Sequence, residues 1–112
     1  MDLVVGVYAE TRRFPKGELY GLVSQMRRAA VSVPSNIAEG KGRITDRDRV
    51  HFFSQARGSL LELETQVQIA LSLDYISEQA ARSLIAQSEE TGRMLSSLIQ
   101  SLRPRTVRPV EV

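Results

Sequence analysis

Seven basic side chains between residues 27 and 57 are the strongest candidates for chemistry in this sequence. They are Arg27, Arg28, Lys41, Arg43, Arg47, Arg49 and Arg57. Arginine suits bidentate contacts with phosphate, so a surface that gathers these residues would bind nucleic acid with an affinity that falls steeply as salt rises. The competing interpretation is a solvated surface on which Asp46, Asp48 and neighbouring acids pair with the arginines. Few aromatic residues are interleaved, which favours recognition of a nucleic-acid backbone or shape over stacking on bases.

A second candidate is a group of polar residues beside Pro34. They are Ser35, Asn36 and Glu39. Proline lacks a backbone N–H and its ring crowds the carbonyl four residues earlier, so it disturbs a helix interior. One hypothesis is a polar binding site at this kink. The other, which we favour, is that these side chains satisfy carbonyls freed by Pro34 or bond Ser59 and Gln66 across the fold, because buried polar groups need partners.

Catalytic chemistry is poorly represented in the sequence. There is no cysteine and His51 is the single histidine, so a Ser-His-Asp set is not arguable. Three residues separate Arg47 from His51, too few for the arginine–histidine motif of small helical ribonucleases, although one helical turn puts both on one face. There is no Glu-x-x-His motif for a di-iron bundle site, and the segment GKGR at 40–43 lacks the spacing of a P-loop. We expect no enzymatic activity, no cofactor and no metal site.

The elements that must position these residues are four helices. Apolar residues recur at steps of three and four, which predicts helices over about 2–12, 18–39, 45–73 and 77–102. Thr45 and Ser77 are good N-caps, residues 74–76 break the pattern, and Gly40 and Gly42 are expected to end the second helix in a left-handed conformation. We expect Tyr8, Leu19 and both Met26 and Met94 to lie on buried faces.

Short connections between these helices predict an all-α, antiparallel up-down-up-down four-helix bundle with a Pro-kinked second helix. The bundle domain is expected to span 1–103 and a flexible tail 104–112. The first helix reaches about 17 Å, whereas the third and fourth run roughly 40 Å at 1.5 Å per residue. Part of the inner face of the longer helices would then lack cover, which predicts a homo-oligomer.

Composition and charge agree with one such domain. The chain has 112 residues, of which 42% are hydrophobic, and no apolar run approaches the ~20 residues that span a bilayer, so we expect a cytoplasmic protein without membrane contact. Residues 12–57 carry ten basic against four acidic residues, a net +6, whereas 58–102 carry two against six, a net −4. Such a split predicts an acidic partner for one half, or self-association between halves.

Three segments carry a resemblance to a known family: FPKGELYGLVSQMRRAAVSVPSNIAEGKGR, FFSQARGSLLELETQVQIAL and EETGRMLSSLIQSLR. Together they resemble the bacterial four-helix-bundle proteins encoded in intervening sequences of large-subunit ribosomal RNA genes. These are more distantly related to the accessory variability determinant proteins of diversity-generating retroelements. The resemblance implies a four-helix bundle that assembles as a pentamer, binds RNA or DNA, and, in the retroelement relatives, engages a reverse transcriptase.

These observations lead to one functional hypothesis and two alternatives. The hypothesis is a non-enzymatic, oligomeric protein that binds structured RNA or DNA through the seven basic residues. The first alternative is a scaffold whose partner is another protein, such as a reverse transcriptase, with no direct contact to nucleic acid. The second is a small helical ribonuclease that uses Arg47 and His51.

Overall fold

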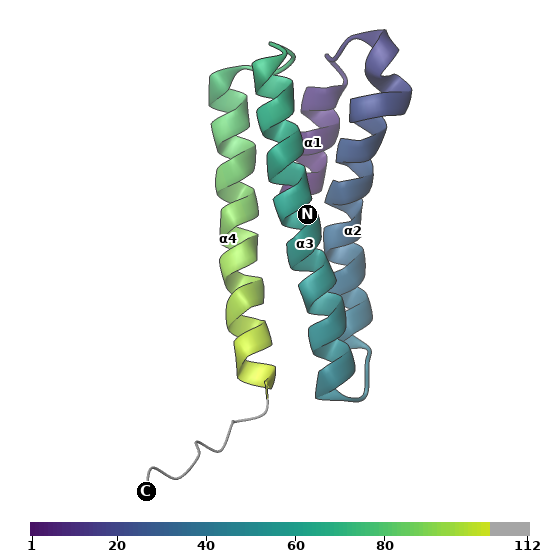
Figure 1. Ribbon diagram of the computed structural model, residues 1–112, viewed down its shortest axis with the longest axis vertical. Coiled ribbons are helices and arrows are strands. Elements are labelled where there is room, and N and C mark those ends of the chain that lie inside the picture. Colours follow the sequence, from purple (N-terminus) through teal and green to yellow (C-terminus); the bar gives the residue numbers. More distant parts are fainter. Residues whose placement is uncertain (104–112) are drawn as a thin grey trace, which may run out of the picture.

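Four α-helices account for most of the chain in the computed structural model, which describes residues 1–103 (Figure 1). They are α1 (Asp2–Thr11), α2 (Ser24–Lys41), α3 (Asp46–Ser72) and α4 (Glu78–Leu102). A short 3₁₀ turn, η1 (Lys16–Glu18), and a π-helical turn, η2 (Leu19–Val23), join α1 to α2. No strand occurs among the described residues. The predicted flexible tail, 104–112, lies outside them.

The helices form the predicted all-α bundle with up-down-up-down order. Each helix packs against the next along the chain, and α4 closes the ring against α1. Figure 1 shows α1 beside only the upper half of the other helices, with the N-terminus near the middle of the bundle. α1 has ten residues and α3 has 27, so the predicted mismatch in length is confirmed.

The core is mostly aliphatic and all four helices contribute to it. Its largest fully buried side chains are Phe53, Met26, Leu60, Leu63, Leu95, Ile99, Val7, Val33 and Val67. Burial of such a side chain stabilises the fold by about 1.5–3 kcal/mol. In the lower half, where α1 is absent, Ile37, Leu98 and Leu102 are half-buried against this core, so no strongly exposed stripe remains along the inner face.

Three predicted core residues lie on the surface instead. Met94 is 51% exposed, and Tyr8 and Leu19 are also exposed. Met94 immediately precedes the fully buried Leu95, and one residue turns a helix by about 100°. An apolar residue at the edge of a stripe therefore looks like core in the sequence but faces solvent in the bundle.

The ends of α3 and α4 follow the sequence prediction. The Thr45 hydroxyl accepts a hydrogen bond from the Asp48 N–H at 3.2 Å, and Ser77 accepts one from the Ala80 N–H at 3.1 Å. Both are N-caps that satisfy backbone donors of the first helical turn. Between the two helices, Asp74 adopts a left-handed conformation with φ 61°, a backbone state that aspartate visits more readily than most residues because its side chain is short and polar.

The second helix departs from its prediction at both ends. Gly21 has non-helical angles, φ −111° and ψ −109°, so the regular helix begins at Ser24 rather than near Glu18. From there α2 runs without a break through Pro34 to Lys41, and the bend at Pro34 stays a prediction. In residues 1–103 no glycine has positive φ, so the expected left-handed stop at Gly40 and Gly42 is wrong.

Gly40 has a packing role in place of the predicted turn role. It lies inside α2 and is buried, and a Cβ placed on it would lie 2.6 Å from Cε1 and 2.9 Å from Cδ1 of Phe53. Carbon atoms in contact normally stay about 3.5–4.0 Å apart. Glycine at this position therefore lets α2 and α3 approach closely at the end of the bundle.

Candidate nucleic-acid interface

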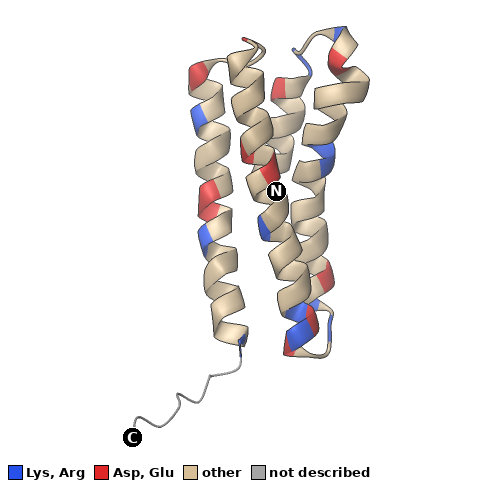
Figure 2. Ribbon diagram, in the orientation of Figure 1, with Lys and Arg blue, Asp and Glu red and all other residues tan. Residues whose placement is uncertain are grey.

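The seven predicted basic residues do not form one surface. Figure 2 shows basic residues on the upper part of α2, a second cluster mixed with acids at the α2–α3 turn, and isolated ones along α3 and α4. Arg28 and Lys41 lie thirteen positions apart on α2, which is about 20 Å at 1.5 Å per residue. The structure thus divides the seven residues into three sets. These are Arg27 with Arg28, a bundle-end group of Lys41, Arg43, Arg47 and Arg49, and Arg57 alone.

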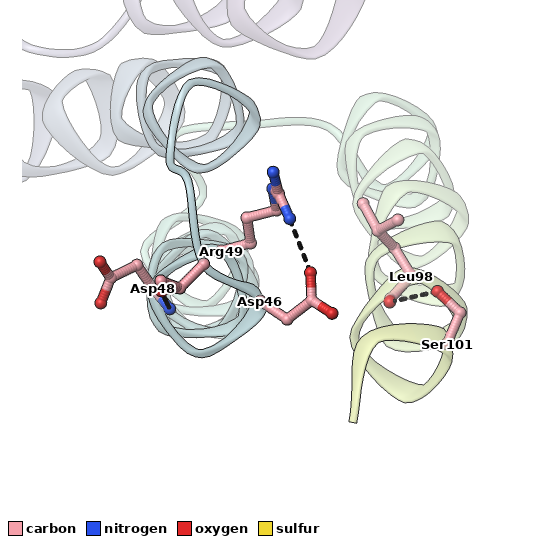
Figure 3. A network of polar contacts seen from close by, with 6 residues as sticks. Asp46, Asp48, Arg49, Leu98 and Ser101 are labelled. Carbon is pink, nitrogen blue, oxygen red and sulfur yellow. Dashed lines mark hydrogen bonds and ion pairs between the residues drawn. The ribbon is translucent and has the colours of Figure 1, made fainter. Parts of the chain in front are cut away.

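The bundle-end group is largely neutralised by its own acids. Arg43 lies 3.6 Å from Glu39, and its guanidinium stacks over the Phe52 ring at 4.6 Å. Arg49 donates to Asp46 at 2.6 Å, and Figure 3 shows this pair turned toward the end of α4. These ion pairs are those that the solvated-surface interpretation expects, although exposed pairs of this kind add little stability, about 0–1 kcal/mol.

Two basic residues of this group have no ion pair within residues 1–103. They are Lys41 and Arg47, both exposed. Arg47 lines a pocket of about 400 Å³ together with Arg103, Val50 and Leu102, but Asp46 also lines it. With Arg103, five basic residues share the bundle end with Glu39, Asp46 and Asp48, so its net charge is +2 but the two signs are interleaved. The bundle end is therefore a weak site for an anion.

Arg57 belongs to a third region on the outer side of α3 and α4. Its Nη1 donates to the Ser96 hydroxyl at 3.3 Å. The surrounding groove also contains Arg93, Glu64 and Glu89, so its charges balance. Arg57 thus lies on a different surface from the other six predicted residues, and its neighbours there are residues of α3 and α4.

Arg27 is held in place by two residues of α1. Its Nε donates to the Thr11 hydroxyl at 3.0 Å, and its guanidinium lies over the Tyr8 ring at 4.6 Å. Thr11 is 2% exposed and its own hydroxyl donates to the Val7 carbonyl at 2.7 Å. A part-buried hydrogen bond and a cation–π contact therefore fix the guanidinium, and its two terminal nitrogens have no acceptor within residues 1–103.

Arg27 and Arg28 share a groove of about 720 Å³ that we call the α2 groove. Its lining residues come from α1, η2 and α2, and none is acidic. They are Tyr8, Leu19, Tyr20, Val23, Ser24, Arg27, Arg28, Val31, Ser32 and Ser35. The carboxylate nearest in sequence, that of Glu18, is engaged elsewhere, since it accepts from the Tyr75 hydroxyl at 2.8 Å. The groove therefore has two positive charges and no counter-charge among its lining residues.

Sequence reasoning missed the aromatic part of this groove. The prediction of little aromatic interleaving is correct along the chain, but folding brings Tyr8 of α1 and Tyr20 of η2 next to the arginines. Tyr20, Ser24, Arg28, Val31 and Ser35 also recur at steps of three and four. That spacing marks one outer helix face, and it could have predicted that these residues line one surface.

Of the three polar residues beside Pro34, Asn36 and Glu39 have side-chain partners within residues 1–103 and Ser35 has none, and the pairings differ from those that the favoured hypothesis names. The Asn36 amide donates to the Ser32 carbonyl at 2.8 Å, and Glu39 pairs with Arg43. The bond across the bundle to Ser59 comes from Ser32, at 2.6 Å, rather than from Ser35, Asn36 or Glu39. Ser35 is exposed and lines the α2 groove. The three residues therefore form no common polar site.

The residues considered for other chemistry are dispersed. His51 is exposed, with Nε2 lying 3.2 Å from the Gln55 amide nitrogen and the ring edge-on to Phe52. Within residues 1–103, no three histidine, aspartate or glutamate side chains are grouped so that they could ligate a metal ion. None of the helices in this part of the chain combines the length and apolar character needed to cross a membrane.

Comparison with known proteins places the chain in a family. Residues 1–97 match the model of the family described as 23S rRNA-intervening sequence protein. The fold is similar to a crystal structure described as a protein with unknown function from the S23 ribosomal protein family from Bacteroides thetaiotaomicron. That similarity has a TM-score of 0.77 at 21% sequence identity, over 87% of this chain and 88% of that one. A search of curated proteins found no match.

Proposed function

The chain belongs to the 23S rRNA-intervening sequence protein family, and we propose that it acts by binding RNA or DNA through the α2 groove rather than by catalysis. The observation that carries this proposal is that Arg27 and Arg28 share a groove without a single acidic lining residue. Such a surface attracts polyanions and releases their counterions on binding. Among the other predicted residues, Arg43 and Arg49 pair with acids, and Arg47 and Arg57 share their pockets with acids.

The non-catalytic part of the proposal rests on what surrounds the titratable groups. His51, the single histidine, has Gln55 as its one polar side-chain partner within residues 1–103. A general acid–base mechanism needs a positioned proton donor or acceptor at the reacting bond. Arg27 and Arg28 lie instead among hydroxyl and apolar groups. The two arginines can bind and orient a phosphate there without moving protons.

The test is nucleic-acid binding across a salt series, with RNA and DNA probes and three variants. Arg27→Ala and Arg28→Ala are each expected to weaken binding and to reduce the salt slope by about 0.7–0.9, the value for one lost phosphate contact. Arg82→Ala is the matched control, because it removes the same charge from an exposed arginine on α4 that pairs with Glu78. Absence of binding at low salt, or equal losses in all three variants, would contradict the proposal.

The scaffold alternative predicts a different result in a co-purification experiment. If the protein binds a reverse transcriptase or another protein directly, the partner is retained after nuclease treatment. If nucleic acid bridges the two, nuclease releases the partner. We expect nuclease to release the partner, because the positive charge of the acid-free groove complements a phosphate backbone.

We further propose that the protein self-associates, with the pentamer that the family resemblance implies as the expected assembly. The support is an apolar pair on the outer face of α3, Leu61 and Ile69, both exposed. They lie eight residues apart, about 12 Å along the helix. Leu61→Glu should lower the mass measured by sedimentation, whereas Gln79→Glu, which also adds a negative charge but at an exposed position on α4 in the groove beside α1, should not. A monomer mass for the unmodified protein at micromolar concentration would contradict self-association.

A further inference from the structure

We propose that the α2 groove takes unpaired nucleotides, with a phosphate on Arg27 and Arg28 and a base against Tyr20. This inference rests on the proposed function and specifies its substrate class as single-stranded rather than duplex nucleic acid. It departs from the sequence-based expectation, which favours recognition of a nucleic-acid backbone or shape over stacking on bases. Three features of the groove carry it: the exposure of Tyr20, the fixed position of Arg27 and the absence of acids.

Tyr20 is the most exposed large hydrophobic residue in the part of the chain that the structure describes, at 93%. It belongs to η2, the irregular turn above α2, and lines the same groove as the two arginines. An aromatic ring left open to solvent beside cationic groups suits a base, since every base has a π-face that stacks on aromatic side chains. Inside a duplex the bases are already stacked on one another, so only an unpaired base can use this ring.

Arg27 supplies a defined place for the phosphate. Thr11 occupies its Nε and Tyr8 covers one face of its guanidinium, so the terminal nitrogens are presented to the groove in a fixed fork. Arginine forks match phosphate oxygens bidentately. Ser24 and Ser35 also line the groove and have no side-chain hydrogen bond within residues 1–103, which leaves two hydroxyls for sugar or phosphate oxygens.

An acidic peptide is the competing occupant, and the groove suits it less well. Its carboxylates would use the two arginines, but an acidic side chain has no flat apolar face to cover Tyr20. The groove has a volume of about 720 Å³ and is lined by Leu19, Val23 and Val31 as well as by the aromatic rings. A ligand with both an anionic and a flat apolar part fills it, and a nucleotide has both.

The experiment compares three probes of equal length and charge: a single strand, an abasic single strand that keeps only the sugar–phosphate chain, and an acidic peptide, with the duplex of the same sequence as a fourth arm. The variants are Tyr20→Ala, Tyr20→Phe, which keeps the ring, and Arg82→Ala as the surface control. We expect Tyr20→Ala to weaken single-strand binding roughly five- to 140-fold, and to leave abasic and duplex binding unchanged. Tyr20→Phe should bind as the unmodified protein does.

The outcomes separate this inference from the proposed function. If the single strand and its abasic form bind equally and Tyr20→Ala has no effect, stacking is excluded while nucleic-acid binding stands. If the acidic peptide binds as tightly as the single strand and loses affinity in Tyr20→Ala, the groove is a protein-docking site and the inference is wrong. If no nucleic acid binds at low salt, the proposed function fails first. Because Tyr20 is almost fully exposed, circular dichroism of its variants should match that of the unmodified protein.

Discussion

Two glycine-to-alanine substitutions should have opposite effects on stability although the chemical change is the same. Gly40 and Gly58 both lie inside helices, in α2 and α3. Alanine is a better helix former than glycine by about 1 kcal/mol in a helix interior. A Cβ at Gly58 meets no atom within 4 Å, whereas one at Gly40 lies 2.6 Å from Phe53 Cε1 and 3.2 Å from Phe52 Cβ. Gly58→Ala is therefore expected to stabilise the protein by about 0.5–1 kcal/mol.

The magnitude for Gly40→Ala follows from the contact that it creates. A carbon contact normally needs about 3.5 Å, so the Phe53 ring must move by nearly an ångström. Phe53 is 2% exposed and packed in the core, so its ring cannot turn into solvent. Overpacking of this kind costs about 1–3 kcal/mol, and the helix gain is reduced because Gly40 is one residue from the end of α2. The expected net effect is a loss of about 1–2 kcal/mol.

Urea unfolding followed by circular dichroism measures both changes as shifts in midpoint at constant slope. Protein concentration should be the same throughout, because self-association would add to the apparent stability. In a Phe53→Leu background, which removes part of the ring, the Gly40→Ala loss should shrink, a coupling expected for residues in contact. If Gly40→Ala is as stabilising as Gly58→Ala, the close approach of α2 and α3 at Gly40 is not what the structure indicates.

Three further predictions concern single residues. Thr11→Val should lower the unfolding free energy by about 1–2 kcal/mol and weaken nucleic-acid binding, because Arg27 loses the acceptor of its Nε; unchanged affinity would show that Arg27 needs no positioning. The hydrogen bond to the Glu18 carboxylate raises the pKa of Tyr75 above its ordinary value of 10. The stability that this hydrogen bond contributes is therefore complete below pH 10, and it is lost as the pH rises through the raised pKa of the folded protein. Thermal unfolding of Tyr75→Phe should therefore lack this alkaline loss, and equal pH profiles would contradict it. Asp74→Gly should stabilise the protein by about 0.5 kcal/mol in denaturant unfolding, since φ 61° is free of strain for glycine.

The sequence by itself determined the features whose causes are local. Thr45 and Ser77 cap helices because their hydroxyls reach N–H groups only three residues away, and Asp74 marks the turn before α4. Apolar spacing likewise determined the number of helices, and the short connections determined the bundle order. The caps and the turn depend on contacts within one turn of the chain, so the identities and spacing of a few neighbouring residues suffice to predict them.

Only the tertiary structure decided which side chains face each other across helices. Gly40 was expected to end a helix by its backbone freedom, yet its role depends on Phe53, thirteen residues away on another helix. Arg27 likewise has its partner on another helix, since its Nε donates to the hydroxyl of Thr11 on α1, sixteen residues earlier in the chain. The physical reason is that periodicity specifies only which way a residue points, whereas helix rotation and offset specify what it meets.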